Sequence, residues 1–438
     1  MNYSFTVVNS KNQHYLGFYD VENGILVSEN KGLTFPSKSK NVTKELSIVM
    51  GTNCNLNCEY CFQQKDRKLY KPSKSMKVSD IEPLIQKLKC LDLSAVRRIV
   101  LWGGEPLLYF KVMKVLSPRL KQEFPWIKKH FFSTNGLLLT PEIINWCYNN
   151  DIHFQISDDG DNSFRGNKAV NKLPQIRQMV KDFLNEHPDA KISVHSVISK
   201  NNLDVNKIVQ TTLANYGEHI GVSFASLHSP TEAKVLPKSA YLFTPEEMRL
   251  VYTSVFKLLT GPQRVLVDDK YLQYARKLFT SRQNTPFACP SGNGNQIAID
   301  GFGNVFPCRS APFEARIVLN DISKYPQHSW RELTKDHFTP TDARIHCKNC
   351  LIKNVCCGLC SIVPNQSIDL LCNSSFAFYF AATQAVLKNL FDVTITEIID
   401  GDEHCKQMFN LLGDPFAYDQ AVENYAKVKK QQIQIQVA

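Results

Sequence analysis

An alternation of short apolar runs with amphipathic segments constrains the fold of this 438-residue chain most strongly. The apolar runs are typical of β-strands and occupy residues 46–50, 99–102, 130–133, 152–157, 192–198 and 220–224. Helical patterns lie between them. Six strand–helix repeats predict a parallel sheet with helices packed outside it. We expect a partial, TIM-like (β/α)6 barrel of the α/β class, because an eight-unit barrel would need more chain before residue 265.

Three of the intervening segments carry recognisable helix starts. One begins at Ser79 and has Glu82 three residues later, the pattern of a capping box. Segments beginning at Thr140 and Thr244 each have proline at the first helical position, where its missing N–H costs nothing. The first helix should bury one apolar face made of Ile81, Leu84, Ile85 and Leu88.

Three closely spaced cysteines follow the first predicted strand. Cys54, Cys58 and Cys61 have the spacing C-x3-C-x2-C and would lie at the carboxyl edge of the sheet, where barrel enzymes keep their reactive groups. Three thiolates can hold three irons of a [4Fe–4S] cube and leave the fourth iron open to a small molecule. The alternative is half a zinc site, which would need a fourth ligand that no nearby histidine supplies.

Polar and glycine-rich turns end the next predicted strands. Gly103 and Gly104 would let a ligand approach the backbone, and Glu105 offers a carboxylate suited to an ammonium group. The strings 133–136 and 157–160 end two further strands with hydroxyls, amides and carboxylates suited to a ribose. We single out Ser133, Asn135 and Ser157 there. Each string taken alone is also an ordinary turn.

The texture changes from about residue 283, where glycine and cysteine become frequent. This second unit has too few periodic apolar residues to fold on its core alone, so we expect metal to stabilise it. A zinc ribbon is the alternative. Cys90, Cys147, Cys357 and Cys405 fall outside any spaced group, and a free cysteine in a helical pattern is usually a small buried hydrophobe. The spaced cysteines of the unit are Cys289, Cys308, Cys347, Cys350, Cys356, Cys360 and Cys372.

Composition and charge exclude several classes of protein. The N-terminus lacks the pattern of a signal peptide, and residues 376–386 are about half as long as a membrane span and suggest a buried helix. We therefore expect a cytoplasmic protein without membrane contact, in which clustered thiols indicate metal rather than disulfides. The net charge of +10 either favours acidic partners or reflects a solvated surface. No stripe of basic and aromatic residues indicates nucleic acid.

Four units follow from these patterns. Residues 1–44 form a β-rich extension of two or three strands around Asn23, and residues 45–265 form the partial barrel. Residues 266–375 form the cysteine-rich unit, and residues 376–438 form a C-terminal helical segment. Polar and apolar side chains alternate over residues 431–437, and we assign no secondary structure to them.

Over residues 45–375 the chain resembles the radical S-adenosylmethionine (SAM) superfamily and its SPASM subfamily, because the C-x3-C-x2-C loop, the Gly-Gly-Glu-Pro turn and the seven-cysteine tail occur together. The resemblance implies that the first three cysteines hold the SAM-cleaving cluster and that residues 103–105 bind the methionine end of SAM. Tyr60 would lie near the adenine and Ser157 would serve the ribose. Arg165 would bind the carboxylate, with Arg177 as the competing candidate.

The same resemblance implies two auxiliary [4Fe–4S] clusters, and so three clusters in all. One would be held by Cys347, Cys350, Cys356 and Cys372. The other, with an open iron, would be held by Cys289, Cys308 and Cys360. The family generates a 5′-deoxyadenosyl radical from SAM with an electron from a flavodoxin- or ferredoxin-type reductant, and that radical abstracts hydrogen from an unactivated carbon.

Two substrate classes compete within the subfamily. Anaerobic sulfatase-maturating enzymes make formylglycine and carry a cysteine and an aspartate where this chain has Asn295 and Arg309, which counts against that role. The alternative is a maturase of ribosomally synthesised precursor peptides that forms carbon–carbon or ether crosslinks at aromatic residues. The short extension resembles that of cyclophane-forming enzymes of the darobactin synthase type. A non-catalytic iron–sulfur electron carrier is the third hypothesis, and the open cysteine site argues against it.

Overall fold

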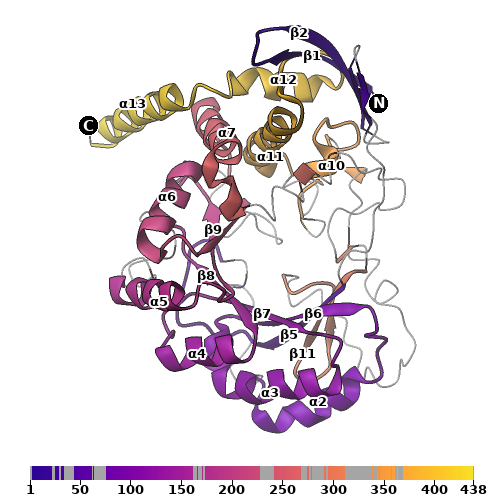
Figure 1. Cartoon of the computed structure of the whole chain (residues 1–438), viewed down its shortest axis with the longest axis vertical. Helices are drawn as coiled ribbons and strands as arrows, with labels where there is room; N and C mark the ends of the chain where they lie inside the picture. The colour runs from indigo at the N-terminus through magenta and orange to yellow at the C-terminus, as the bar shows by residue number, and fades with distance from the viewer. Residues whose placement is uncertain are drawn as a thin grey trace.

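A curved sheet with helices on its outer side forms most of the molecule, and two smaller layers cover one end of it (Figure 1). The computed structural model describes residues 2–21, 25–28, 31–33, 44–61, 63, 75–160, 165, 170, 173–226, 241–267, 274–275, 278, 291–292, 294–310, 338, 343–344, 346–356, 358–360, 363 and 368–437. The turn predicted at Asn23 lies outside these residues.

The predicted partial barrel is confirmed. An eight-stranded sheet has the order β10-β9-β8-β7-β6-β5-β11-β12, in which the six barrel strands follow chain order and are all parallel. They are β5 (Lys44–Gly51), β6 (Val96–Gly103), β7 (Lys129–Thr134), β8 (Ile152–Ser157), β9 (Ile192–Ile198) and β10 (Gly221–Ser226). The carboxyl ends of these strands therefore meet at one edge, which places the turns after them side by side.

One helix follows each barrel strand. These helices are α2 (Ile81–Leu88), α3 (Phe110–Glu123), α4 (Pro141–Asn149), α5 (Pro174–Glu186), α6 (Val205–Tyr216) and α7 (Pro245–Thr260). The predicted starts at Thr140 and Thr244 are confirmed, since each side chain accepts a hydrogen bond from the third helical N–H. The predicted face of α2 is also buried.

The capping box predicted at Ser79 is wrong. A short 3-10 helix, η2 (Val78–Asp80), precedes α2, and Asp80 accepts a hydrogen bond from the Lys77 backbone at 2.7 Å. The physical reason is that the chain enters the helix two residues earlier, through η2, so that Lys77 is the capping position and Asp80 is the acidic residue three positions after it.

The inner face of the barrel is polar. Along β8, residues 152, 154 and 156 are buried among the core, whereas His153, Gln155 and Ser157 are half-buried on the opposite face. Gln155 donates to Ser223 on β10 at 2.8 Å, and His153 shares a hydrogen bond of 2.9 Å with Ser193 on β9. Period-two alternation thus gives one apolar face under the helices and one face suited to a polar ligand.

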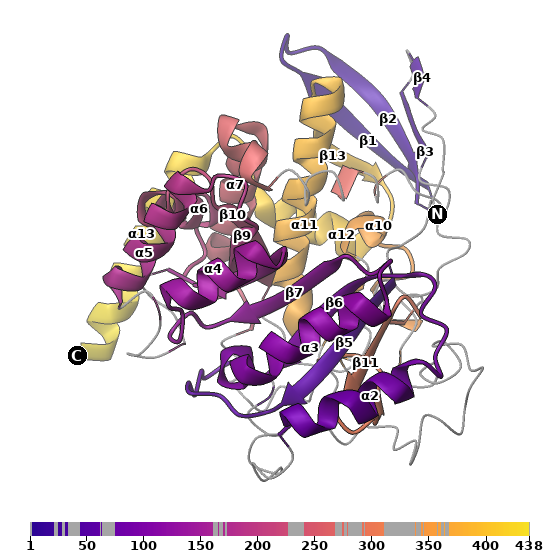
Figure 2. The ribbon, with the colours of Figure 1, turned by 60° about the horizontal axis from the view of Figure 1, so that its bottom comes forward.

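Two segments distant in sequence form the second sheet, whose order is β13-β1-β2-β3-β4 (Figure 2). Its strands are β1 (Asn2–Asn9), β2 (His14–Asp20), β3 (Ile25–Ser28), β4 (Lys31–Leu33) and β13 (Val393–Asp400). The extension is β-rich as predicted, but the helical prediction is wrong over residues 393–400. That run is rich in β-branched residues, and its antiparallel partner β1 comes from the other end of the chain.

The C-terminal region is otherwise helical, with α11 (Ile368–Phe391), α12 (Glu403–Leu412) and α13 (Tyr418–Val437). Within the described residues, α11 alone is long and apolar enough to cross a membrane, yet 78% of its apolar window is buried in the protein. The buried helix predicted over residues 376–386 is confirmed. The last helix includes residues 431–437, for which the sequence supported no assignment.

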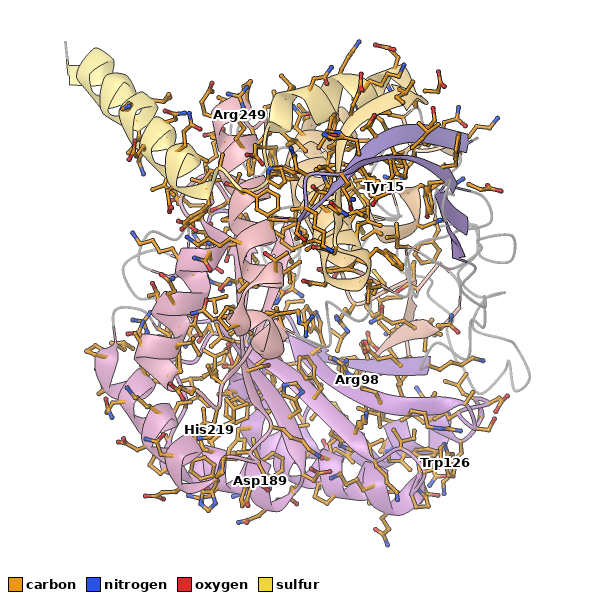
Figure 3. The ribbon with its side chains drawn as sticks, turned by 45° about the horizontal axis from the view of Figure 1, so that its top comes forward. Tyr15, Arg98, Trp126, Asp189, His219 and Arg249 are labelled. Atoms are coloured by element: carbon orange, nitrogen blue, oxygen red, sulfur yellow. The ribbon has the colours of Figure 1, made fainter. Side chains whose placement is uncertain are left out.

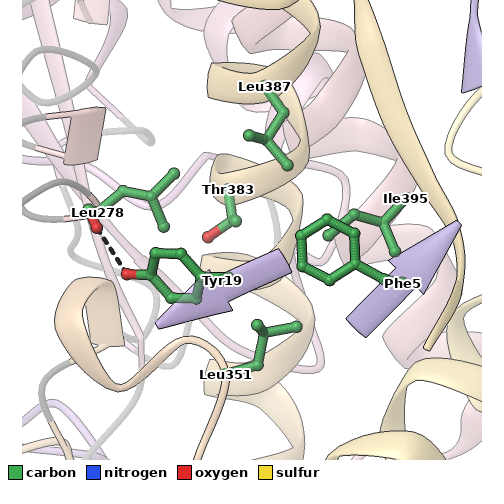
Figure 4. A pocket seen from close by; sticks show the side chains of 7 residues that line it. All are labelled: Phe5, Tyr19, Leu278, Leu351, Thr383, Leu387 and Ile395. Atoms are coloured by element: carbon green, nitrogen blue, oxygen red, sulfur yellow. Dashed lines mark hydrogen bonds between the residues drawn. The ribbon is translucent and has the colours of Figure 1, made fainter. Parts of the chain in front are cut away.

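The second sheet packs on α11 and on the cysteine-rich unit. Phe5 of β1 and Tyr19 of β2 meet Thr383 and Leu387 of α11 around a small apolar pocket (Figure 4). The Tyr19 hydroxyl donates to the Leu278 carbonyl at 2.6 Å and accepts from Asn354 Nδ2 at 3.0 Å. Because these partners are buried, the N-terminal extension is part of the compact structure rather than an appendage.

The cysteine-rich unit is continuous with the barrel. Its described elements are η6 (Pro262–Val267), β11 (Gln296–Asp300), β12 (Val305–Phe306) and the short helix α10 (Lys353–Cys356). Strand β11 pairs in parallel with β5, which makes it a seventh parallel strand of the barrel sheet. Residues of this unit can therefore reach the inner face of the barrel.

Candidate functional site

The cysteine loop packs directly on the Gly103-Gly104 turn at the carboxyl edge of the sheet. Gly104 donates to the Gly51 carbonyl at 3.1 Å. A Cβ on Gly104 would lie 2.3 Å from the carbonyl oxygen of Asn53, and one on Gly103 would lie 2.9 Å from that of Gly51. The space freed by the two glycines is filled by the backbone that carries the cysteines, whereas the sequence predicted that a ligand would use it.

Glu105 is buried behind this turn and joins the ends of β6 and β7. Its carboxylate accepts hydrogen bonds from Leu107 N at 2.9 Å, from Thr134 Oγ1 at 2.7 Å and from Asn135 N at 2.7 Å. Burial raises the pKa of the Glu105 carboxyl, and the three hydrogen bonds oppose that rise. The side chain is thus held in one position by neighbours on two strands.

Asn135 continues the connection to the cysteine loop. Its Nδ2 donates to Asn55 Oδ1 at 2.6 Å and lies 3.9 Å from Cys54 Sγ. The Cys54 sulfur also accepts from Leu56 N at 3.4 Å. Amide donors directed at a sulfur stabilise its thiolate form.

Tyr60, between the second and third cysteines, reaches the end of β8. Its hydroxyl donates to the Asp159 carboxylate, which also accepts from Arg165 Nε at 2.8 Å and from Val197 N at 2.8 Å. The Arg165 guanidinium lies 5.4 Å from the centre of the Tyr60 ring. The cysteine loop is therefore attached to β8 and β9 through one buried carboxylate.

The structure separates the two arginine candidates. Arg165 lies close enough to Cys58 to lower the pKa of that thiol, although burial raises it more. Arg177 instead donates to Asp158 at 2.9 Å, and Asp158 also accepts from Tyr216 at 2.9 Å. Both aspartates of the 157–160 string are thus used by protein donors, and Arg165 is the arginine beside the cysteine loop.

The two serines predicted for the ribose lie on the inner face of the barrel. Ser133 donates to Gln155 at 3.5 Å, and Ser157 stands beside His195 of β9 in the parallel register. The structure therefore brings Tyr60, Glu105, Asn135 and Arg165 to the cysteine loop, and it puts Ser133 and Ser157 on the adjoining barrel wall.

The three thiols of the loop lie near one another. The pKa of Cys58 is raised to about 11 mainly by burial, which Arg165 opposes, and Cys61 and Cys54 contribute to the rise. Among the described residues no group of three or more His, Cys, Asp or Glu side chains is placed to hold one metal ion. In a [4Fe–4S] cube each cysteine would bind a different iron.

The C-terminal cysteines gather in the same unit, although Cys289 lies outside the described residues. The pKa of Cys350 is raised by its hydrogen bond to Cys405 and by burial, and then by Cys356 and Cys372. Cys347 precedes Cys350 by one turn, with a backbone hydrogen bond of 3.4 Å between them. The thiols predicted for the four-cysteine cluster are therefore close together, as a shared cluster requires.

Sequence patterns missed two neighbours of this cysteine group, both on α12. Cys405 is fully buried and hydrogen-bonds Cys350 and the hydroxyl of Tyr3. His404 lies 3.6 Å from the Cys372 sulfur and stacks on His346 at 4.2 Å. No spacing rule connects α12 to the cysteine-rich unit, so only the tertiary fold could reveal them.

A charged group on the inner wall was also missed. Glu45 of β5 pairs with Arg98 of β6 at 3.3 Å and with Arg309, the residue after Cys308. Figure 3 shows Arg98 on the inner side of the curved sheet. Arg309 stacks on Trp102 with 4.9 Å between the guanidinium carbon and the ring centre. These residues lie on the wall formed by β5, β6 and β11.

Comparison with known proteins finds a family model that matches part of the barrel. Residues 48–170 match the model of the radical SAM superfamily. The radical SAM cyclopropyl synthase TigE of Paramaledivibacter caminithermalis is 21% identical over 344 residues, which cover 72% of this chain and 67% of that protein. The 7-carboxy-7-deazaguanine synthase of Methanocaldococcus jannaschii is 28% identical over 197 residues, 41% of this chain and 74% of that protein.

A solved structure shares the fold. The structure of anSMEcpe with bound AdoMet superposes with a TM-score of 0.55 at 17% identity and covers 79% of this chain and 98% of that chain. The same protein has been solved with AdoMet and the Kp18Cys peptide, with a TM-score of 0.52. At this identity the likeness establishes the architecture, a parallel α/β barrel followed by a further C-terminal region.

Proposed function

We propose that this chain, which carries a radical SAM domain within residues 48–170, is an enzyme that crosslinks side chains of a ribosomally made precursor peptide. The observation that carries the proposal is the convergence of four strand ends on the C-x3-C-x2-C loop. The loop packs on the Gly103-Gly104 turn, Asn135 donates to Asn55, and Tyr60 donates to Asp159. A site assembled from four strands can hold a cluster together with a second ligand.

In this proposal Cys54, Cys58 and Cys61 would hold the SAM-binding cluster. When bound, the cluster and SAM supply a 5′-deoxyadenosyl radical that abstracts hydrogen from the substrate. Glu105 keeps the Asn135 backbone in place, and Asn135 in turn donates toward the cysteine loop.

Cys347, Cys350, Cys356 and Cys372 would hold one auxiliary cluster, and Cys289, Cys308 and Cys360 would hold the other. Their chemistry suits removal of an electron from a substrate radical after bond formation. The reductant would be a flavodoxin- or ferredoxin-type protein in a reducing cytoplasm, which matches the high number of free thiols.

A peptide substrate is supported by the known proteins and by the inner face. TigE is named as a cyclopropyl synthase, and anSMEcpe was solved with a peptide. The inner face presents the hydroxyls, imidazoles and amide of Ser133, His153, Gln155, Ser193 and Ser223. Such groups can hydrogen-bond a peptide backbone. Carbon–carbon or ether crosslinking at aromatic residues is the finer part of the proposal.

Two alternatives predict different products. Formylglycine formation would need a base, and Arg309 stands where that role was expected in the family pattern and is itself paired with Glu45. An electron carrier would need no SAM. Anaerobic reconstitution with iron and sulfide, followed by SAM and dithionite, separates the electron carrier from the two enzymes, because only the enzymes form 5′-deoxyadenosine. The peptide product then separates the two enzymes.

Cys58→Ala tests the loop, and Cys90→Ala is the matched control because Cys90 lies on the end of α2 and hydrogen-bonds Gln86. We expect the first variant to lose 5′-deoxyadenosine formation and the second to retain it. A crosslinked peptide would lose two hydrogen masses per bond. Unchanged peptide mass across candidate precursors would contradict crosslinking, and formylglycine in a sulfatase peptide would favour the alternative.

A further inference from the structure

A net positive charge on the inner wall of the barrel indicates a second binding site. Arg98 and Arg309 share one carboxylate, that of Glu45, so the group carries a net positive charge. Glu45 also accepts from Gln296 and lies 3.5 Å from Ser47 Oγ. Four side chains therefore share this one carboxylate, whereas each guanidinium presents five N–H donors.

The two arginines repel each other. Burial lowers the pKa of Arg98, Glu45 raises it, and the nearby Arg309 lowers it again. A second negative charge between the guanidiniums would remove this repulsion, because charges attract more strongly in the low dielectric of a protein interior than in water.

Two buried donors face the same place. The indole Nε1 of Trp102 is buried and makes no hydrogen bond to the described residues, and the buried Nε of Arg98 has only the Glu45 carboxylate near it, at 3.3 Å. Buried donors in native proteins nearly always have an acceptor, so an oxygen-bearing ligand is expected here.

Aromatic rings hold both guanidiniums in position. Arg98 lies 4.3 Å from the centre of the Phe131 ring, and Arg309 lies 4.9 Å from that of Trp102. Cation–π contact fixes the plane of each guanidinium and leaves its edge free to bind. A carboxylate is the group whose two oxygens match such an edge.

We propose that Arg98, Arg309 and Trp102 form a subsite that binds a carboxylate of the substrate peptide inside the barrel. This inference rests on the proposed peptide substrate and adds that the peptide is acidic at the residue held there. The carboxylate could belong to an aspartate or glutamate side chain or to the peptide C-terminus. Arg309 would thus set substrate choice at the position next to Cys308.

Three probe peptides separate the sources of the carboxylate. Ac-Gly-Gly-Glu-Gly-Gly-NH2 carries only a side-chain carboxylate, Ac-Gly-Gly-Gln-Gly-Gly-OH carries only a terminal one, and Ac-Gly-Gly-Gln-Gly-Gly-NH2 is neutral. Saturation-transfer NMR on the reconstituted full chain, without reductant, gives a dissociation constant for each. We expect one of the acidic peptides to bind at least about tenfold tighter than the neutral one, a difference of about 1.4 kcal/mol.

Arg98→Gln and Arg309→Gln should each abolish that preference. Arg97→Gln is the matched control, since Arg97 carries the same charge one residue away on the exposed side of β6. It should keep the preference. Arg309→Lys should keep only part of the preference for the acidic peptide, because an ammonium cannot bind a carboxylate with two parallel hydrogen bonds.

Equal binding of acidic and neutral peptides to the wild-type chain would overturn the subsite. So would an equal loss in Arg97→Gln and Arg98→Gln, which would point to long-range charge. Circular dichroism and thermal melting of each variant identify a folding defect. If a glutamine variant does not fold, the binding preference of Arg309→Lys tests the subsite instead. The assay involves no SAM cleavage, so failure of the proposed enzyme activity shows separately as missing 5′-deoxyadenosine.

Discussion

The Arg165 guanidinium donates two hydrogen bonds to the Asp159 carboxylate, at 2.8 Å from Nε and 3.1 Å from the second nitrogen. The side chain of Asp159 is 2% exposed and that of Arg165 is 10% exposed, so the pair is almost fully removed from water. The Asp159 carboxylate also fixes Tyr60, and therefore the whole cysteine loop depends on it.

Replacing Asp159 should be costly for that reason. We expect Asp159→Asn to lower the free energy of unfolding by about 3–5 kcal/mol, because it leaves a buried arginine without its counter-charge. Urea denaturation measures the change. Asp151→Asn is the control, since Asp151 and Lys191 form a pair in which both side chains are more than half exposed, and it should cost less than about 1 kcal/mol. Similar losses in both variants would contradict the prediction.

We predict that position 105 requires a carboxylate. In Glu105→Gln an amide NH2 would face one of the three donors that the carboxylate now accepts. We expect a loss of about 1–3 kcal/mol in the free energy of unfolding from the unpaired buried donors, together with weaker SAM binding. Calorimetry and equilibrium dialysis measure the two effects. Glu142→Gln, at a side chain that is 71% exposed, should change neither.

The buried His130 predicts a pH dependence. Burial, with a smaller effect of Lys121, lowers the pKa of His130 to about 3, whereas an unfolded histidine titrates near 6.5. The unfolded chain then binds more protons between these values, so this contribution is fully present above about pH 6.5 and is lost as the pH falls toward 3.

Urea denaturation midpoints measured between pH 7.5 and pH 5 test this dependence. In this range the free energy of unfolding should fall by at most about 1.4 kcal/mol for each pH unit below the pKa of the unfolded histidine. His130→Gln should flatten the slope between pH 6.5 and pH 5, because glutamine does not titrate. An unchanged slope in the variant would show that another group is responsible.

Gly104 should be irreplaceable for cluster loading. In Gly104→Ala the new Cβ would meet two backbone oxygens of the cysteine loop at 2.3 Å, so the loop must move. We expect a destabilisation of about 1–3 kcal/mol from overpacking and a lower iron content per chain after reconstitution. Gly160→Asn is the control, because a Cβ added there would meet no atom within 4 Å and asparagine tolerates the positive φ. Full iron content in Gly104→Ala would refute the packing argument.

Tyr19 tests whether the N-terminal sheet is integral to the fold. Tyr19→Phe removes a buried hydroxyl and leaves the Leu278 carbonyl and Asn354 Nδ2 each short of a partner. We expect a loss of about 1–3 kcal/mol in the free energy of unfolding. Tyr15→Phe, on the same strand as Tyr19, removes an exposed hydrogen bond to Gln13 and should fall within about 0.5 kcal/mol of wild type. Equal effects would mean that the sheet is only loosely attached.

The sequence by itself determined the barrel and the place of its cysteines. Period-two and helical patterns are local signals, so the six strands of a parallel sheet and the starts at Thr140 and Thr244 could be derived without a structure. The resemblance to radical SAM enzymes was available for the same reason, since Cys54, Cys58 and Cys61 lie within one loop.

Only the tertiary structure decided which distant residues meet. It chose Arg165 over Arg177 at the cysteine loop, paired β13 with β1 across nearly the whole chain, and brought Cys405 to Cys350. It also placed Arg309 against Glu45 on the inner wall of the barrel. Each of these contacts joins residues that no spacing rule connects, because packing of whole elements, rather than local backbone preference, sets which side chains share one buried volume.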